Sequence, residues 1–137
     1  MTAAETTVLD ASALGKRLAE EQHTAAFNAW HDKFLAGGGR AVAPHILRYE
    51  LGNLLTKKAR TDSLLTPERR ERLLEVTLLG LQFAEGSGTE GFAPPLSYYD
   101  AAYVALARSL KATLVTYDDK MVAAAKKAKV RVLSPGA

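Results

Sequence analysis

The sequence predicts an α/β fold, namely a three-layer α/β/α sandwich built around a short parallel sheet. The strand candidates are short and apolar, and several are rich in β-branched residues. Segments with helical periodicity separate them, and strands joined through helices form parallel sheets that are covered on both faces. Acidic residues directly follow the strand candidates near the two ends of the chain. That is the end of a strand at which open parallel sheets hold their ligands.

The composition limits the class of protein. The 137 residues suffice for one domain, expected to span residues 1–137, with a single buried core. No stretch of about 18 apolar residues occurs, so no membrane span is expected. The chain begins without the basic and apolar regions of a secretory signal. Cysteine is absent, which excludes disulfides and thiolate metal sites and favours a cytoplasmic location.

The first strand is expected at residues 6–9, and Asp10 follows it directly. Ser12 is placed to cap a helix that begins at Ala13. A second helix is expected over residues 22–35 and ends at the glycine triplet 37–39. Its apolar side is expected to consist of Ala25, Ala26, Ala29, Trp30 and Phe34. The triplet lacks the Lys-Ser/Thr of a phosphate-binding loop, so we interpret it as a helix end and turn.

A carboxylate interrupts the apolar side of the next helix. Residues 41–43 form a minimal strand candidate, and Pro44 suits the first turn of a helix that ends near residue 59. Glu50 lies on the apolar side of this helix, three residues after Leu47. A carboxylate in that position is costly unless it is paired or bound to a cation. Glu50 is therefore expected either to form a salt bridge at the edge of the stripe or to bind a cation.

Two further helices are expected in the middle of the chain. Thr66 and Pro67 are typical of a helix cap and first position, and this helix is expected to continue through Leu81. Ser97 and Asp100 have the spacing of a capping box at the start of the next helix. The apolar stripe of that next helix is expected to comprise Tyr99, Tyr103, Leu106, Ala107 and Leu110.

The chain closes with a strand, a helix and an edge strand. Residues 113–116 form a short apolar run that leads into Asp118 and Asp119. We expect Asp119 to cap the last helix, which precedes a strand at residues 130–133.

Four acids occupy comparable places in this arrangement. Asp10 and Asp118 follow buried strands, Glu50 lies in the early turns of a helix after a strand, and Asp100 lies in the first turn of its helix. If the strands are parallel, all four converge at one end of the sheet. Clustered carboxylates repel one another unless cations neutralise them, and oxygen ligands suit Mg²⁺ or Mn²⁺. Such ions activate water and stabilise a phosphodiester under attack. Taken singly, each acid can instead be a helix-capping residue.

The motifs that carry these acids resemble those of PIN-domain ribonucleases. They are VLDASAL at 8–14, PHILRYELGNLL at 44–55, LSYYDAAYVALA at 96–107 and LVTYDDKM at 114–121. The similarity covers most of the chain and is closest to the VapC toxins of bacterial and archaeal toxin–antitoxin pairs.

The resemblance implies a PIN-like fold and a set of functional residues. Asp10, Glu50, Asp100 and Asp118 would be the catalytic, metal-binding acids, and Asp118 is preferred over Asp119 because it matches the T-x-D pattern. The supporting residues would be Ser12, Asn53 and Thr116. The resemblance also implies RNA cleavage with Mg²⁺ or Mn²⁺, a homodimer, and an antitoxin protein that inserts a segment near the active site. In one departure, the interval before Ser97 looks too short for the strand and helix that the family usually has there.

Other protein classes fit the acids less well. A phosphorylated receiver domain needs paired acids after its first strand, whereas this chain has D-A-S there. An aspartyl phosphatase needs D-x-D, and Ser12 occupies the position of the second acid. The remaining alternative is a catalytically inactive PIN-like module that binds RNA or protein.

Charge and apolar surface suggest partners. Three basic clusters make a polyanion plausible. They consist of Lys57, Lys58 and Arg60; Arg69, Arg70 and Arg72; and Lys126, Lys127, Lys129 and Arg131. The helix over 22–35 and the helix that begins at Thr66 both have more apolar surface than a small domain needs, which predicts a homodimer through one of them.

Overall fold

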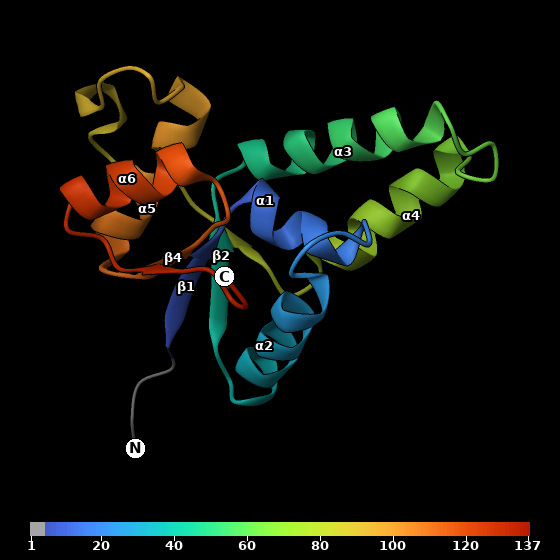
Figure 1. Cartoon of the computed structure of the whole chain (residues 1–137), viewed down its shortest axis with the longest axis horizontal. Coiled ribbons are helices and arrows are strands. Elements are labelled where there is room, and N and C mark those ends of the chain that lie inside the picture. Colours follow the sequence, from blue (N-terminus) through green and yellow to red (C-terminus); the bar gives the residue numbers. More distant parts are fainter. Residues whose placement is uncertain (1–4) are drawn as a thin grey trace.

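The computed structural model describes residues 5–137 and contains a five-stranded, fully parallel sheet in the order β3-β2-β1-β4-β5 (Figure 1). The strands are β1 (Thr6–Leu9), β2 (Arg40–Ala43), β3 (Gln82–Phe83), β4 (Thr113–Val115) and β5 (Val132–Leu133). The helices are α1 (Ala11–Leu14), α2 (Thr24–Ala36), α3 (Ile46–Ala59), α4 (Pro67–Leu78), α5 (Tyr98–Leu110) and α6 (Asp119–Lys127), with short 3₁₀ turns at Gly15–Arg17 and Thr89–Gly91. The predicted α/β class and parallel sheet are confirmed.

The chain starts in the centre of the sheet and builds outward on both sides. Val8 of β1 pairs with Val42 of β2 on one side and with Leu114 of β4 on the other. Helices α5 and α6 lie on one side of the sheet and α2 lies on the other (Figure 1). Helices α3 and α4 pack against each other as a hairpin that projects from the body of the domain (Figure 1). Because all strands are parallel, the segments that follow them meet at one edge of the sheet.

The core is formed by the sheet and by the helix faces that lie against it. Helix α5 is the most deeply embedded helix, since Tyr103 to Ala107 are all buried. Leu9, Leu47 and Leu106 are fully or almost fully removed from solvent. Along the described chain, residues 5–137, no helix combines the length and the apolar character that crossing a bilayer requires.

The largest correction concerns the segment before Ser97. Helix α4 ends at Leu78 and not at Leu81, because Leu79 is extended and Gly80 has a φ of +77°. The chain then forms β3, whose Gln82 and Phe83 pair with Val42 and Ala43. The strand that the short interval left in doubt is therefore present, followed by a 3₁₀ turn at Thr89–Gly91.

Two helices turn a different face inward than the sequence predicts. In α2 the buried residues are Thr24, Phe27 and His31, whereas Ala25 and Ala29 are exposed. Thr24 is buried because its hydroxyl accepts from the Glu21 amide and donates to the Ala19 carbonyl. The predicted apolar side is correct for Trp30 and Phe34, which pack against the core, and wrong for Ala25 and Ala29.

In α5 the expected stripe is correct only at its centre. Tyr103, Leu106 and Ala107 are buried, but Tyr99 and Leu110 are 61% and 43% exposed. These two residues lie in the first and last turns of the helix, beyond the part that the sheet covers.

Two helices are capped by the acids Asp10 and Asp118, which the sequence offered as alternative caps, and not by Ser12 and Asp119. Helix α1 begins at Ala11, and its cap is Asp10 and not Ser12. Helix α6 begins at Asp119, and its cap is Asp118. Asp10 directly follows β1, whereas Thr116 and Tyr117 separate Asp118 from β4. Each of these two carboxylates accepts a hydrogen bond from an amide of its helix, Ala13 in α1 and Met121 in α6.

Candidate active site

Asp10 is the most enclosed acid of the site. It follows β1, is 2% exposed, and its Oδ1 accepts a hydrogen bond of 2.9 Å from the Ala13 amide as the N-cap of α1. The Ser12 hydroxyl donates to both carboxylate oxygens, at 2.8 and 3.0 Å. The Thr116 hydroxyl donates to Oδ2 at 2.5 Å. Asp10 is therefore held in one orientation by hydroxyl and amide donors.

The same two hydroxyls connect the ends of β1 and β4. Thr116 Oγ1 accepts from the Asp118 amide at 3.1 Å, and Ser12 Oγ accepts from the Tyr117 amide at 2.9 Å. Each hydroxyl thus bonds Asp10 on one side and the backbone of the segment after β4 on the other. This arrangement fixes Asp118 relative to Asp10. Two of the three residues that the sequence resemblance gave as supporting ones, Ser12 and Thr116, are part of this network.

Asp118 lies at the start of α6. Its Oδ1 accepts from the Met121 amide at 3.0 Å, and the side chain is only partly buried. An acid in this place faces the positive end of the helix dipole.

Glu50 is oriented by a buried tyrosine. The side chain of Glu50 is half-buried, and the hydroxyl of Tyr103 on α5 donates to its Oε1. Tyr103 is only 1% exposed, so packing fixes the position of this donor. The salt bridge that the sequence left open for Glu50 is not among the ion pairs of residues 5–137.

Asp100 lies in the first turn of α5, where its amide donates to the Ser97 hydroxyl at 3.0 Å. Its side chain is partly exposed and is influenced by the positive charge of Lys120 on α6.

Electrostatic repulsion connects the four carboxylates. Burial raises the pKa of Asp10 to about 6, the hydrogen bonds from Thr116 and Ser12 oppose this, and repulsion by Asp118 adds to it. Burial also raises the pKa of Glu50, with a further contribution from Asp100. The pKa of Asp100 is raised by burial and by Asp118. These charge–charge contributions link Asp10 to Asp118, Asp118 to Asp100, and Asp100 to Glu50. The four acids therefore form one electrostatic cluster.

The donor set suits a hard cation. Within residues 5–137, none of the ion pairs includes any of the four acids. No three aspartate, glutamate or histidine side chains of these residues lie close enough to share one ion. Mg²⁺ is typically held by one or two carboxylates and keeps several waters, so a site built from pairs of these acids fits its coordination.

Two residues beside the acids, Tyr103 and Lys120, were not predicted from the sequence. The sequence placed Tyr103 only in the apolar stripe of its helix. Its hydroxyl was the available signal, because a buried tyrosine hydroxyl usually has a hydrogen-bond partner. Lys120 follows the acids Asp118 and Asp119 directly, but its approach to Asp100 depends on how α6 packs on α5.

Asn53 has a different environment from the other supporting residues. It lies on α3, one turn after Glu50, and lines a cavity of about 640 Å³ between α3 and α4. No side-chain hydrogen bond within residues 5–137 connects it to an acid.

Comparisons with known proteins agree with this architecture. The structure is similar to that of PAE2754 from Pyrobaculum aerophilum, with 26% identity, coverage of 95% of this chain and 92% of that one, and a TM-score of 0.63. It is also similar to VapBC2 from Rickettsia felis, solved bound to a DNA fragment from their promoter. In that case the identity is 14%, the coverage is 93% of this chain and 97% of that one, and the TM-score is 0.63.

A comparison with curated protein sequences found no match to this chain. The PIN domain family matches residues 7–127, a range that contains β4 and all four acids. This match spans most of the chain. The chain therefore belongs to the PIN domain family.

Proposed function

We propose that this protein is a Mg²⁺- or Mn²⁺-dependent endoribonuclease and the toxin of a toxin–antitoxin pair. The observation that carries the proposal is the buried Asp10 carboxylate, which is held by hydroxyl and amide donors and repelled by Asp118. Such an arrangement costs stability unless a cation is bound. PIN domains are typically metal-dependent nucleases, which agrees with this chemistry.

The residues of the site have distinct roles in this proposal. Asp10 and Asp118, with Asp100 and Glu50 beside them, would hold the ion or ions. A bound Mg²⁺ or Mn²⁺ supplies an activated water and stabilises the charge that develops on the phosphodiester. Ser12 and Thr116 orient Asp10, and Tyr103 orients Glu50. Lys120, beside Asp100, is placed to attract the phosphate backbone of the substrate.

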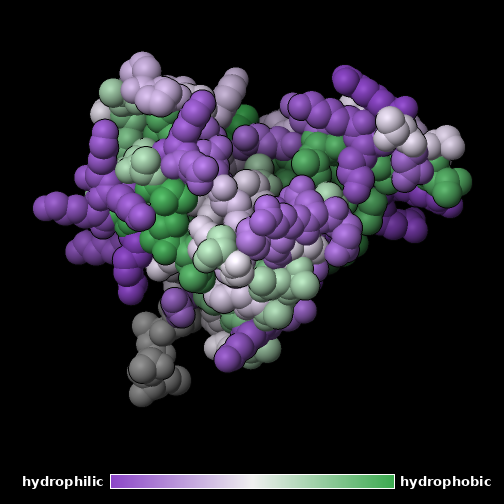
Figure 2. Space-filling model, viewed as in Figure 1, coloured by the Kyte–Doolittle hydropathy of each residue, from purple (hydrophilic) through white to green (hydrophobic). Residues whose placement is uncertain are grey.

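Partners follow from the same proposal. VapBC2 from Rickettsia felis was solved with a DNA fragment from their promoter, and we propose that the present chain is likewise paired with an antitoxin. We further propose a homodimer through α4 and its C-cap, where Leu73, Val76 and Leu79 are 43%, 60% and 75% exposed. Figure 2 shows apolar surface along the α3–α4 hairpin.

The test is single-turnover cleavage of a structured RNA by the parent and by Asp10→Asn, with and without EDTA. Asn keeps the size and the capping ability of Asp but removes the charge that a cation needs. The parent should cleave only with Mg²⁺ or Mn²⁺, and Asp10→Asn should be slower by orders of magnitude while remaining folded. The matched control is Glu75→Gln, which makes the same carboxylate-to-carboxamide change at an exposed position of α4. This variant should cleave like the parent.

Equal cleavage by Asp10→Asn and the parent in Mn²⁺ would contradict the nuclease proposal. RNA binding by a parent that never cleaves would favour the inactive binding module instead.

A further inference from the structure

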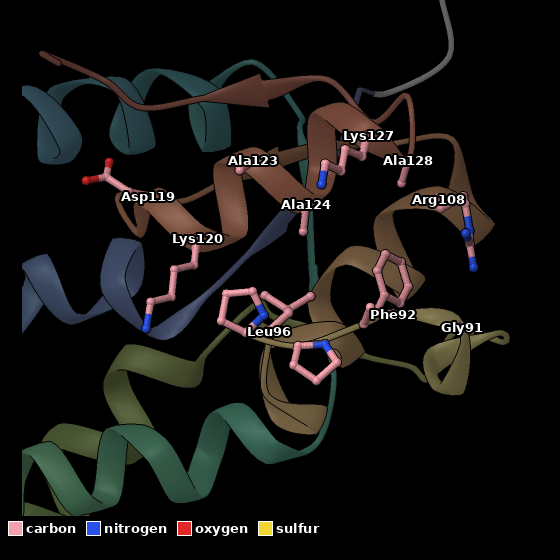
Figure 3. Close-up of a pocket in the computed structure, with 13 residues that line it drawn as sticks. Gly91, Phe92, Leu96, Arg108, Asp119, Lys120, Ala123, Ala124, Lys127 and Ala128 are labelled. Atoms are coloured by element: carbon pink, nitrogen blue, oxygen red, sulfur yellow. The ribbon is translucent and has the colours of Figure 1, made fainter.

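A groove of about 600 Å³ runs along α6, on the side that faces the segment 91–96 (Figure 3). Its floor is apolar and includes Phe92, Leu96 and Ala124. Its charged lining residues are Arg108, Lys120, Lys127 and the single acid Asp119. In Figure 3 the carboxylate of Asp119 points away from the groove, so the charges that face the groove are positive.

One end of the groove lies at the start of α6, where Asp119 and Lys120 line it. Asp118, one of the four acids, is the N-cap of the same helix, and Lys120 follows it by two residues. Lys127 lies seven residues further on, two turns away on the same side of α6, or about 10 Å along the helix axis. Neither lysine takes part in the ion pairs found within residues 5–137. The ammonium groups of Lys120 and Lys127, near the two ends of α6, are thus available to a ligand in the groove.

A second, smaller cleft continues the positive lining. It has a volume of about 160 Å³ and contains Lys111, Lys129 and Arg131, with Arg108 shared between this cleft and the groove. We refer to the six cations Lys120, Lys127, Arg108, Lys111, Lys129 and Arg131 as the basic track. Figure 2 shows hydrophilic side chains projecting around this α5–α6 side of the molecule.

Arg108, at the junction of groove and cleft, is held in place. Its guanidinium lies 5.0 Å from the centroid of the Phe92 ring, and its Nη2 is 3.4 Å from the Gly88 carbonyl oxygen. A planar cation stacked on an aromatic ring is a surface on which a nucleic-acid base can stack.

Two lysines of the track have an unfavourable backbone. Lys111 and Lys129 have φ values of +53° and +60°, the left-handed conformation that favours glycine at the end of a helix. A lysine there costs stability relative to glycine. Strain of this kind, kept at two positions of one charged cleft, points to a role for the side chains.

We propose that the basic track binds the single-stranded RNA that extends from the phosphate at the acid cluster. The proposal rests on the nuclease function above and names the path of its substrate. RNA fits better than an acidic protein segment because one end of the track, Lys120, follows the cluster acid Asp118 by two residues on the same helix. It also combines cations for phosphates with an apolar, aromatic floor for bases.

The test uses the double variant Lys111→Gly/Lys129→Gly in the full chain. Binding of a fluorescein-labelled oligoadenylate of about ten nucleotides is followed by anisotropy in EDTA, where no cleavage is needed. The double variant should bind at least about fivefold more weakly at low salt, with a salt slope that is shallower by about 1.4 for two lost phosphate contacts. Its melting temperature should be equal or higher, because glycine relieves the strain.

Two further variants separate charge from stacking. Lys33→Ala removes an exposed lysine of α2, outside the track, and should bind RNA like the parent. Phe92→Leu should weaken RNA binding without a change in salt slope, because it removes a stacking surface and no charge.

Unchanged RNA affinity in the double variant would overturn the proposal. So would displacement of the RNA by an oligoglutamate of equal charge at equal concentration, which would point to a protein ligand. If the parent fails to cleave but the double variant loses RNA affinity, the nuclease proposal fails and the track stands. If the parent cleaves and the double variant keeps its affinity, only the track fails.

Discussion

Asp10 has a structural role in the fold and is also the carboxylate on which the proposed chemistry depends. As the N-cap of α1 it satisfies the Ala13 amide, and through Ser12 and Thr116 it connects β1 to the end of β4. Hydroxyl donors bond a neutral or a charged carboxyl, but the charged form is disfavoured here by burial and by Asp118. The stability of the metal-free protein therefore depends on the protonation of this one group.

The first prediction concerns pH. The pKa of Asp10 is about 6 in the folded chain against an ordinary value of 3.8, so the folded state binds the proton more tightly than the unfolded state. Stability in EDTA should therefore fall as the pH rises from about 4 to about 6, by on the order of 3 kcal/mol from this group, and stay lower above that range. Urea unfolding at a series of pH values measures it.

Asp10→Asn should remove most of this pH dependence and raise the stability of the metal-free protein at neutral pH. Glu75→Gln should keep the dependence of the parent. A parent that becomes more stable between pH 4 and pH 6 in EDTA would show that the carboxylate is not the destabilised group.

The second prediction concerns Tyr103. Tyr103→Phe removes the hydroxyl that donates to Glu50 and leaves the buried ring in place. We expect a loss of about 1 kcal/mol in the free energy of unfolding and a cleavage rate about 10- to 100-fold lower. The pKa of Glu50, already raised by burial, should rise further, because the hydrogen bond from Tyr103 opposes that rise. The rise of activity with pH should then move to higher pH.

Tyr49→Phe is the matched control, since Tyr49 is 68% exposed and directly precedes Glu50. A normal rate and pH profile in Tyr103→Phe would mean that Glu50 needs no orientation by this hydroxyl.

At the level of helices and loops, the segment between β3 and α5 is fixed by close backbone contact. A Cβ at Gly86 would lie 2.5 Å from the backbone of Ala105 and Leu106 in α5. Only glycine allows this approach. The contact holds the start of the loop that carries Phe92, and therefore one wall of the groove along α6.

The third prediction follows from that contact. Gly86→Ala should lower the free energy of unfolding by about 1–3 kcal/mol, because two backbone segments must move apart to admit the methyl group. Gly91→Ala, at a position where a Cβ meets nothing within 4 Å, should change stability far less. Chemical denaturation of both variants gives the comparison, and equal stabilities would argue against the close packing.

Local patterns predicted some elements well and others poorly. The strand at residues 6–9 and the cap and proline of α4 were correct because neighbouring residues determine them. Strand β3 was missed because two residues show no periodicity, and its existence depends on pairing with Val42 and Ala43. The inward face of α2 was predicted correctly at Trp30 and Phe34 but without Thr24 and His31, which are buried and bonded to residues 17–21.

The candidate site shows the same division. The proximity of the four acids could be predicted because a parallel sheet brings the ends of its strands together, whatever the distance along the chain. Tyr103 and Lys120 were not, because their roles depend on the packing of α5 against α3 and α6. For Asp10 and Asp118, the structural and functional interpretations were posed as alternatives, and both residues do cap helices.

Considered as a whole, the molecule has a compact sheet body and one protruding hairpin. The hairpin of α3 and α4 begins beside Glu50 and ends in exposed apolar residues, among them Val76 and Leu79. Exposed apolar residues grouped on a projecting element are typical of a protein contact.

The fourth prediction is therefore a dimer that depends on α4. Light scattering at tens of micromolar should give about twice 14.7 kDa for the parent and 14.7 kDa for Val76→Glu, because an unpaired charge in an apolar contact is costly. Glu75→Gln, at the neighbouring position, should stay dimeric. A parent that is monomeric under these conditions, or a Val76→Glu variant that remains dimeric, would exclude this surface as the dimer contact.

The capping role of the acids has a consequence for evolution. Asp and Asn differ by a single base change in the genetic code, and the two residues cap helices about equally well. At Asp10 and at Asp118, such a change removes a negative charge yet keeps the cap and the hydrogen-bond network around it. Selection for a stable fold does not oppose that change and, at Asp10, favours it. The proposed nuclease activity would therefore persist across generations only under selection for that activity.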